Sequence, residues 1–381
     1  MPRLPDPDAT LDVLRRIGAA PTAPYHELAA LAAIRAELER SGIATTTDRY
    51  GQLQARVSRG TAARALVFVA HTDHPAFEVT VANGREGRAR VLGGFRGAQV
   101  AAPFAVRVHD DEGTDPFPAR CDEPRPELDH EHNSPGTVRI RAEGPLRVGQ
   151  WAVLDMPAVE VVGDEVRMAA ADDLAGCALA VSALAALRDD DRPHDAYALF
   201  TRAEETGLYG ARLVAEDGLI PREAYVVSIE ASRALPHVPA GDGVVVRAGD
   251  YHNTFSNEAE RYLRVAAERL AQAGIGTQRA LLTGGTCEAS SFVRLGWVAT
   301  GMALPNVNYH NQSPDGTFAP EIVRLSDLRS GIALAVEAAV AAAEDASESW
   351  WPDVRTVPRA IRDLLDRGVL REGHSTKEGH S

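Results

Sequence analysis

Short apolar runs of strand length alternate with helical segments along most of this chain of 381 residues. The run Ala65–Ala70 is apolar throughout, which is typical of a strand buried on both faces of a sheet. Strands that alternate with helices predict an α/β fold, in which helices flank a mostly parallel sheet. The predicted strands are 43–48, 53–57, 65–70, 196–201, 224–230, 279–282 and 298–302. The predicted helices are 25–40, 173–187, 207–215, 257–273, 288–295 and 325–344.

The segment 74–166 has a different sequence pattern. Its short alternating runs are separated by turn residues, and it lacks long helical periodicity, which predicts a small inserted β-barrel. The predicted strands of this insert are 77–81, 89–92, 106–109, 137–141 and 151–154. Its middle part, 110–136, is rich in Asp, Glu and Pro and predicts a mobile surface segment. We therefore expect a discontinuous catalytic domain, residues 1–79 and 164–381, and an inserted barrel domain, residues 80–163.

The charge of the chain argues against some classes of partner. With 54 acidic and 40 basic residues, the formal net charge is -14, which disfavours nucleic acid or an anionic membrane. The three cysteines, Cys121, Cys177 and Cys287, are too widely spaced for a disulfide framework or a Cys-x-x-Cys zinc site. The sequence has neither a signal peptide nor an apolar run of about 18 residues, so we expect a soluble cytoplasmic protein. The tail after Ala346 ends in a polar run that is expected to be disordered.

A pair of adjacent carboxylates, Glu204 and Glu205, follows the predicted strand 196–201 and precedes a glycine and a helix. Neighbouring residues at a strand end point to different sides. One carboxylate can therefore bind a metal ion while the other faces a water molecule held by that ion. Metal-assisted hydrolysis needs this division of roles.

Other residues that commonly bind metals lie at strand ends, at strand-to-helix turns or in a loop, and open α/β sheets place their sites at the carboxyl ends of strands. They are His71, Asp172, Glu230 and His310. Together with Glu205 they provide two histidines and three carboxylates, which suit two zinc-like ions with one bridging carboxylate. Asp73 is placed to hold the ring of His71. Glu204 is then left as the general base.

Each candidate also has a simpler interpretation. Asp172 could cap the following helix, His310 could be a solvated loop residue, and the pair Glu204 and Glu205 could complement a helix dipole. Glu230 is harder to explain in this way, because a carboxylate that ends a buried strand needs a partner. Residues to which we give less weight are Cys177, Cys287, His74, His109, His252 and the run Asp129–His132. The ordered joint occurrence of ligands and base favours a metal site.

The order of the motifs, His-x-Asp, Asp-Asp-x-x-Gly, Glu-Glu-x-Gly, an acidic residue and a final His, resembles that of cocatalytic dinuclear zinc metallopeptidases. More narrowly, the chain resembles the glutamyl/leucyl aminopeptidase family, which includes tetrahedral aminopeptidases and proteins described as endoglucanases. The resemblance extends from Tyr25 to Glu344, and the long gap between His71 and Asp172 is the place of that family's barrel insert. Further matching pieces are Gly93-Gly94, Arg147-Val-Gly-Gln150, Glu204-Glu-Thr-Gly-Leu-Tyr-Gly-Ala211, Gly241-Asp-Gly-Val244 and Gly284-Gly-Thr286.

The resemblance implies a zinc exopeptidase fold and a role for each candidate. The implied ligands of two divalent ions are His71 and Glu230 for the first, Glu205 and His310 for the second, and Asp172 between them. Glu204 would be the general base, and Asp73 would orient His71. Zinc is the expected metal, although cobalt and manganese suit the same ligands. The substrate would be a peptide with a free N-terminus, and the chain would form a dimer-based homo-oligomer that can reach a dodecamer.

Two residues depart from the pattern of this family. Glu230 stands where the family usually has Asp, and Cys287 stands where its Gly-Gly-Thr-Asp motif has Asp, so a carboxylate is lost or displaced to Glu288. Related carboxypeptidases and N-acyl amino acid deacylases often carry Glu at the first position, and these activities are the main alternative. The cations that could hold a free-carboxylate substrate are Arg202, Arg233 and Arg247. A non-catalytic structural or binding relative is a further alternative, against which the complete set of ligands and base argues.

Overall fold

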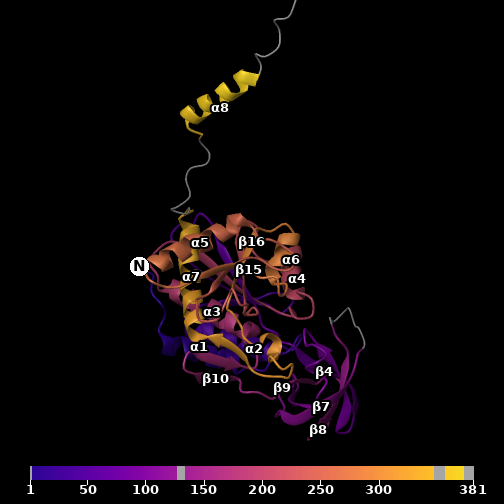
Figure 1. Cartoon of the computed structure of the whole chain (residues 1–381). Helices are drawn as coiled ribbons and strands as arrows, with labels where there is room; N and C mark the ends of the chain where they lie inside the picture. Colours follow the sequence, from indigo (N-terminus) through magenta and orange to yellow (C-terminus); the bar gives the residue numbers. More distant parts are fainter. Residues whose placement is uncertain (1, 127–133, 347–356, 373–381) are drawn as a thin grey trace, which may run out of the picture. The chain divides into compact units, whose positions relative to one another are not determined.

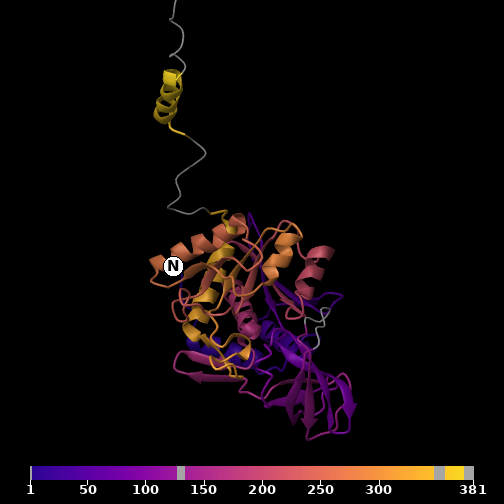
Figure 2. The same cartoon turned by 45° about the vertical axis from the view of Figure 1, so that its right-hand side comes forward.

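The structure is a computed structural model, and it describes residues 2–126, 134–346 and 357–372. Residues Met1–Ala346 form one unit, and Ser347–Ser381 form a second. Within the first unit, an α/β layer structure carries a β-barrel at one end (Figures 1 and 2). The predicted fold, a helix-flanked and mostly parallel sheet with an inserted barrel, is confirmed.

The main sheet has eight strands in the order β1-β2-β12-β3-β13-β16-β14-β15. Their bounds are Thr45–Thr47 (β1), Leu53–Arg59 (β2), Leu66–His71 (β3), His194–Thr201 (β12), Tyr225–Glu230 (β13), Val245–Gly249 (β14), Gln278–Leu281 (β15) and Ala299–Ala303 (β16). The central strands β12, β3, β13 and β16 are parallel to their neighbours in this set. Their carboxyl ends therefore lie along one edge of the sheet, where α/β proteins place their sites.

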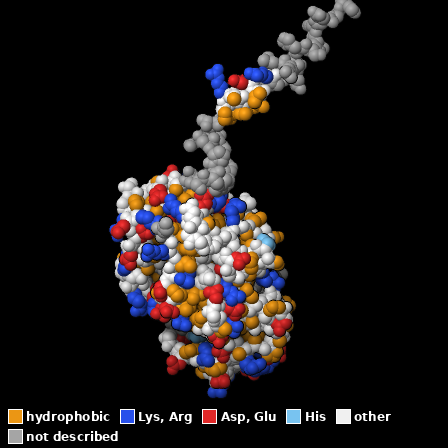
Figure 3. All heavy atoms as spheres, turned by 60° about the vertical axis from the view of Figure 1, so that its left-hand side comes forward, with side chains coloured by type: hydrophobic (Ala, Val, Ile, Leu, Met, Phe, Trp, Pro, Cys, Tyr) orange, Lys and Arg blue, Asp and Glu red, His pale blue; other side chains and the backbone are white. Residues whose placement is uncertain are grey.

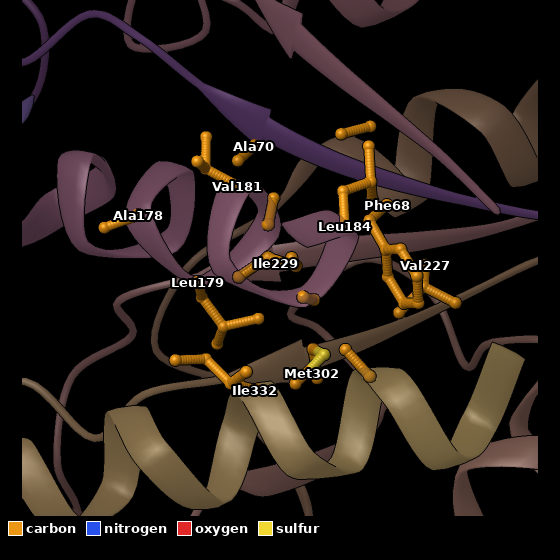
Figure 4. Packing of buried hydrophobic residues seen from close by; sticks show 14 of the residues in the cluster. Phe68, Ala70, Ala178, Leu179, Val181, Leu184, Val227, Ile229, Met302 and Ile332 are labelled. Atoms are coloured by element: carbon orange, nitrogen blue, oxygen red, sulfur yellow. The ribbon is translucent and has the colours of Figure 1, made fainter. Parts of the chain in front are cut away.

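Helices cover both faces of this sheet because the side chains of its strands alternate between two buried layers. In β3, Phe68 and Ala70 pack with residues of α3 and α7 on one face (Figure 4), whereas Val67 and Val69 pack with α4 and α6 on the other. The helices on the first face are Pro7–Gly18 (α1), Leu28–Arg40 (α2), Ala171–Arg188 (α3), Asn257–Gln272 (α5) and Leu325–Ala343 (α7). Those on the second face are Tyr209–Asp217 (α4) and Glu288–Arg294 (α6). Burial on both sides explains why the strands read as continuous apolar runs.

Phe68 is fully buried in the larger of these layers, and we expect its replacement by Ala to destabilise the fold. Phe68→Ala should lower the free energy of unfolding by about 3–5 kcal/mol, because a cavity is left where an aromatic ring was packed. Denaturant unfolding followed by circular dichroism measures this loss. Val148→Ala, at a side chain that is 67% exposed, is the matched control and should change the stability by less than about 0.5 kcal/mol. An equal loss in both variants would contradict the assigned core.

The inserted barrel is closed, with the strand order β4-β5-β8-β7-β6-β9. Its strands are Ala76–Asn83 (β4), Glu86–Leu92 (β5), Phe104–His109 (β6), Phe117–Arg125 (β7), Thr137–Ala142 (β8) and Trp151–Leu154 (β9). Strand β7 lies within 110–136, so the prediction of a surface segment was wrong for its residues, which pair with both β6 and β8. The division of the chain at 79, 80, 163 and 164 stays a prediction.

A small third sheet, absent from the sequence predictions, lies in the order β10-β11-β17. Its strands are Val159–Val162 (β10), Glu165–Met168 (β11) and Glu321–Arg324 (β17). A 3-10 turn, Tyr309–Asn311 (η1), precedes β17 in the chain. The sequence predictions also missed α1 and β14. Strand β11 leads into α3 and pairs with β17, which follows η1, so this sheet connects these two parts of the chain.

The second unit contains one described helix, Arg359–Glu372 (α8), which the sequence analysis did not predict. Apolar side chains on one side of α8 are exposed, among them Ile361, Leu364 and Leu365 (Figure 3). The rest of the predicted tail, 347–356 and 373–381, lies outside the described residues, as does the run Asp129–His132. Among the helices that the structure describes, none combines the length and apolar character needed to cross a membrane.

Candidate active site

The candidate residues converge at the carboxyl edge of the central strands. His71 ends β3 and Glu230 ends β13, and β3 is paired in parallel with both β13 and β12. The pair Glu204 and Glu205 follows β12, whose Thr201 lies opposite His71 in the register. Parallel pairing thus brings together residues that are far apart in the sequence.

Asp172, near the start of α3, lies between the two histidines. His71 Nε2 is 3.2 Å from Asp172 Oδ1, and His310 Nε2, from η1, is 3.4 Å from Asp172 Oδ2. His71 Nε2 also lies 3.9 Å from Glu230 Oε2, and His310 Nε2 lies 3.3 Å from Glu205 Oε1. One carboxylate therefore presents a separate oxygen to each half of the site. The alternative that Asp172 caps α3 gains no support, because both of its carboxylate oxygens face the histidines.

Both histidines present the same ring nitrogen to this centre. The Nδ1 of His71 donates to the carbonyl oxygen of Asp73 at 3.1 Å, and the Nδ1 of His310 donates to the carbonyl oxygen of Gly94 at 3.3 Å. These bonds leave each Nε2 lone pair directed at the carboxylates, as metal-binding histidines require. Gly94 belongs to the barrel, and a Cβ there would lie 2.5 Å from the His310 ring, which explains why a glycine is needed at this close approach.

Two buried carboxylates fix the backbone that carries the glutamate pair. Asp73 Oδ1 accepts from the Glu204 amide at 2.9 Å, and Asp73 Oδ2 accepts from the Glu205 amide at 3.0 Å. Glu27 accepts from the amide of Ala203 at 3.0 Å, one residue earlier. The carboxylate of Asp73 also lies 3.6 Å from His71 Nδ1, so Asp73 contacts His71 and the glutamate pair at once.

The electrostatics of the cluster indicate an excess of buried negative charge. Burial and the neighbouring carboxylates raise the pKa of Glu204 well above its usual range, and burial together with Asp172 raises the pKa of Glu230 to about 8. Burial alone would lower the pKa of His71, but Glu204, Asp172 and Asp73 hold it well above its ordinary value. A bound cation would offset this charge.

The donor set fits divalent metal ions. Three groups of residues can each bring one ligand atom within 4.8 Å of the others: His71, Glu204 and Glu205; His71, Asp172 and Glu230; Asp172, Glu205 and His310. The buried Glu230 Oε1 has no hydrogen-bond partner among the residues described. Imidazole nitrogens with carboxylate oxygens form a typical zinc donor set.

A cavity of about 640 Å³ opens beside this cluster and includes Glu204, Glu205 and His310 in its wall. The barrel contributes Gly94, Arg96 and Gln99 to the same wall. Other lining residues are Thr206, Gly207, Leu208, Tyr209, Arg212, Arg233, His252, Gly284, Gly285, Thr286, Tyr309 and Gln312. A cavity of this size accommodates a small-molecule or peptide-end ligand.

Residues 141–318 match the model of a protein family described as M42 glutamyl aminopeptidase. Over this segment the chain resembles M42-family peptidases. The matched segment contains Asp172, Glu204, Glu205, Glu230 and His310, whereas His71 precedes it. No curated protein sequence matches the chain.

Solved structures share the fold of this chain at low sequence identity. An aminopeptidase from Desulfurococcus kamchatkensis is 19% identical with a TM-score of 0.72, over 93% of this chain and 99% of that one. A TET aminopeptidase from a Thaumarchaeota archaeon is 19% identical with a TM-score of 0.73, over 87% of this chain and 96% of that one. A TET1 peptidase from Pyrococcus horikoshii, described as assembling into a tetrahedron or a large octahedral shell, is 22% identical with a TM-score of 0.71, over 87% and 99%.

The other candidate residues from the sequence lie in different surroundings. Of the three candidate cations, Arg233 lines the cavity, Arg202 is paired with Glu27 at 2.7 Å, and Arg247 is buried against Ser232. The wall also includes His252, to which we gave little weight, and Arg96 and Arg212, which sequence patterns did not single out. An isolated arginine in a loop or on a short helix carries no pattern that could have marked these two.

Cys287, which replaces the Asp of the Gly-Gly-Thr-Asp motif, and the following Glu288 do not line the cavity. Cys287 is buried, and burial raises the pKa of its thiol to about 12. Glu288 is fully buried and accepts from the Thr201 hydroxyl at 2.5 Å. The alternative that the missing carboxylate is displaced to Glu288 gains no support from the cavity wall, which does not include this residue.

Proposed function

We propose that this protein hydrolyses N-terminal residues from peptides that bind in the cavity. Two divalent metal ions, with zinc as the proposed metal, would assist the reaction. One observation carries the proposal: Asp172 faces both His71 and His310, at 3.2 and 3.4 Å, beside a glutamate on the wall of the cavity. The match to the M42 aminopeptidase family supports the same activity. Cobalt and manganese suit this donor set as well.

Each half of the cluster would hold one ion. His71 and Glu230 would bind the first, Glu205 and His310 the second, and Asp172 would contribute one oxygen to each. When bound, two such ions act as Lewis acids on the scissile carbonyl and on the attacking water.

Glu204 is the proposed general base. It is part of the cavity wall, and burial with nearby carboxylates raises its pKa well above the usual range of a glutamate. A base whose pKa lies nearer to neutrality transfers protons efficiently in both directions. Glu204 would take a proton from the attacking water and deliver it to the leaving amine, which becomes the new N-terminus of the shortened peptide. The hydrogen bond from its amide to Asp73 holds the residue in place.

An acidic N-terminal side chain fits the cavity best. Arg96, Arg212 and Arg233 line it, and the carboxylates in the wall, Glu204 and Glu205, are those of the proposed metal site. Burial and the neighbouring Arg96 lower the pKa of Arg233, as expected for a cation without a full complement of counter-charge. A substrate carboxylate would supply that charge.

Arg233→Met tests this preference. We expect kcat/KM to fall by about tenfold or more for peptides that begin with Glu and by less than about threefold for peptides that begin with Leu, because only the former lose a charge-assisted contact. Arg15→Met, at an exposed side chain on α1, is the control and should leave both values unchanged. Equal losses for the two peptides would remove Arg233 from substrate recognition.

The arginines of the cavity would also suit a second candidate function. A carboxypeptidase or N-acyl amino acid deacylase would place a free substrate carboxylate on Arg233, and Glu230 is the residue that favours this alternative. Short peptides with free, N-acetylated and C-amidated ends separate the activities when products are read by mass spectrometry. We expect cleavage of free and C-amidated peptides from the N-terminus. Cleavage that requires an N-acyl group or a free C-terminus would move the assignment to the second candidate.

We also propose that the chain is cytoplasmic and forms a dimer-based homo-oligomer, up to a dodecamer. The assembly described for the Pyrococcus horikoshii relative supports the second point. Light scattering coupled to size-exclusion chromatography measures the mass directly. A non-catalytic relative remains the third candidate, and metal binding without hydrolysis of any peptide in the panel would favour it.

A further inference from the structure

One buried carboxylate outside the proposed metal ligands connects both halves of the site. Glu321, the first residue of β17, is fully buried. Its Oε2 accepts from the backbone amide of Asp172 at 2.9 Å, and its Oε1 accepts from the backbone amide of His310 at 2.7 Å. The side chain of Asn306 donates a third bond to Oε1 at 3.0 Å. Glu321 lies after the segment that matches the family.

The two amides that donate to Glu321 belong to residues whose backbone conformations differ. Asp172 has φ -84° and ψ 101°, ordinary extended values although the residue lies within the bounds of α3. His310 has φ 54° and ψ 38°, in the left-handed region that residues with a Cβ seldom occupy. The conformation of His310 persists only where the surroundings hold it. Glu321 provides a hydrogen bond to each.

A second connection runs in parallel through His74. Its Nδ1 lies 2.5 Å from the carbonyl oxygen of Asp172, and its Nε2 lies 2.8 Å from Oδ1 of Asn311, the residue that follows His310. The side-chain nitrogen of Asn311, Nδ2, in turn donates to the carbonyl oxygen of Ala169 at 3.0 Å. The start of α3 and the turn η1 are thus joined twice, once through Glu321 and once through His74. The distance between Asp172 and His310 is set by this frame rather than by direct contact between their backbones.

We propose that Glu321 is a positioning residue that sets the separation of Asp172 and His310, and so controls the affinity of the ion that these two residues share with Glu205. The inference rests on the proposed metal site. Glu321 does not bind the ion itself, because both of its oxygens accept from backbone amides. Its effect should be larger on that ion than on the other, since no hydrogen bond between described residues joins its carboxylate to His71 or Glu230.

The test compares Glu321→Gln with a control variant that weakens the same kind of hydrogen bonds, between a buried carboxylate and backbone amides, away from the site. Asp327 is also fully buried and accepts two backbone amides, those of Gly241 and Gly243, each at 2.8 Å. Asp327→Asn therefore removes the same kind of bonds away from the site. Zinc is titrated into chelator-treated full-length protein by calorimetry, and thermal unfolding is recorded for each variant.

We expect Glu321→Gln to weaken one of two zinc affinities by about 10- to 100-fold, and to weaken the other, which depends on Glu321 only through Asp172, by less than about tenfold. kcat should fall with little change in KM, because the substrate-lining residues stay in place. Asp327→Asn should lower the unfolding temperature to a similar extent without altering either affinity. Glu321→Asp keeps the charge but is too short to reach both amides, and it should show a smaller selective loss; it also serves if the Gln variant does not fold.

Different results separate this inference from the function on which it rests. If the wild-type chain binds two ions and the Glu321 variants bind both as tightly, the positioning role is wrong and the metal site stands. If Asp327→Asn weakens zinc as much as Glu321→Gln, the effect is one of general stability and the positioning role is again wrong. If the wild-type chain binds no zinc, cobalt or manganese, the proposed function fails and the inference fails with it.

Discussion

Glu204→Gln is expected to lower kcat by about 10²- to 10⁴-fold, the range that a general base contributes. The variant should still bind metal, because Asp172, His71, Glu230, Glu205 and His310 remain. Glutamine has nearly the same shape as glutamate but cannot take a proton from water at neutral pH. The amide of residue 204 would still donate to Asp73, so the turn that carries it should keep its place.

Steady-state kinetics with a peptide substrate measure this loss, and elemental analysis of the same sample measures the metal content. Glu223→Gln, at an exposed position, is the matched control and should behave like the wild type. Turnover retained within about tenfold of the wild type would rule out Glu204 as the base. Lost activity together with lost metal would instead make Glu204 a ligand.

Asp172→Asn is expected to have a second large effect, the loss of metal from both halves of the site. The carboxylate faces His71 Nε2 with one oxygen and His310 Nε2 with the other, so an amide would turn an NH₂ group toward one of the two positions. Replacement of a residue that only supports a ligand costs about 10- to 100-fold in metal affinity, and the loss of a shared ligand should exceed this range. Peptide hydrolysis should fall below detection.

Calorimetric zinc titration of chelator-treated protein measures this effect. The control is Asp191→Asn, whose side chain is 94% exposed and lies far from the site in a loop after α3. His71 and His310 hold the pKa of Asp172 well below its usual range, so the charged carboxylate also stabilises the metal-free fold, and the chelated variant should unfold at a lower temperature than the chelated wild type. One ion bound with unchanged affinity would show that Asp172 serves only one half of the site.

The sequence was sufficient to predict the part of the fold and of the candidate site that depends on apolar strands. Strands β3, β12 and β13 are buried on both faces, which produces continuous apolar runs, and a polar residue at the end of such a run is conspicuous. His71, Glu230 and the pair Glu204 and Glu205 could be selected in this way. Parallel pairing then brings these ends together without any further information.

Other parts of the structure have no such signal. Strand β7 was missed because Pro118, Pro124 and several charged residues interrupt its alternation, although barrel pairing on both sides still forms it. Glu321 was missed because β17 has only four residues, and its importance depends on the two backbone amides that it contacts. The arginines of the cavity are likewise brought together only by tertiary structure.

The most direct test of the account measures metal content and peptide hydrolysis on one sample. The purified chain is stripped with a chelator, and zinc is added back in steps while removal of the N-terminal residue from a free peptide is followed. We expect no hydrolysis by the stripped protein, and activity that rises with bound zinc and saturates at two ions per chain. Hydrolysis that persists at full rate without metal, or that never appears although two ions bind, would contradict the account.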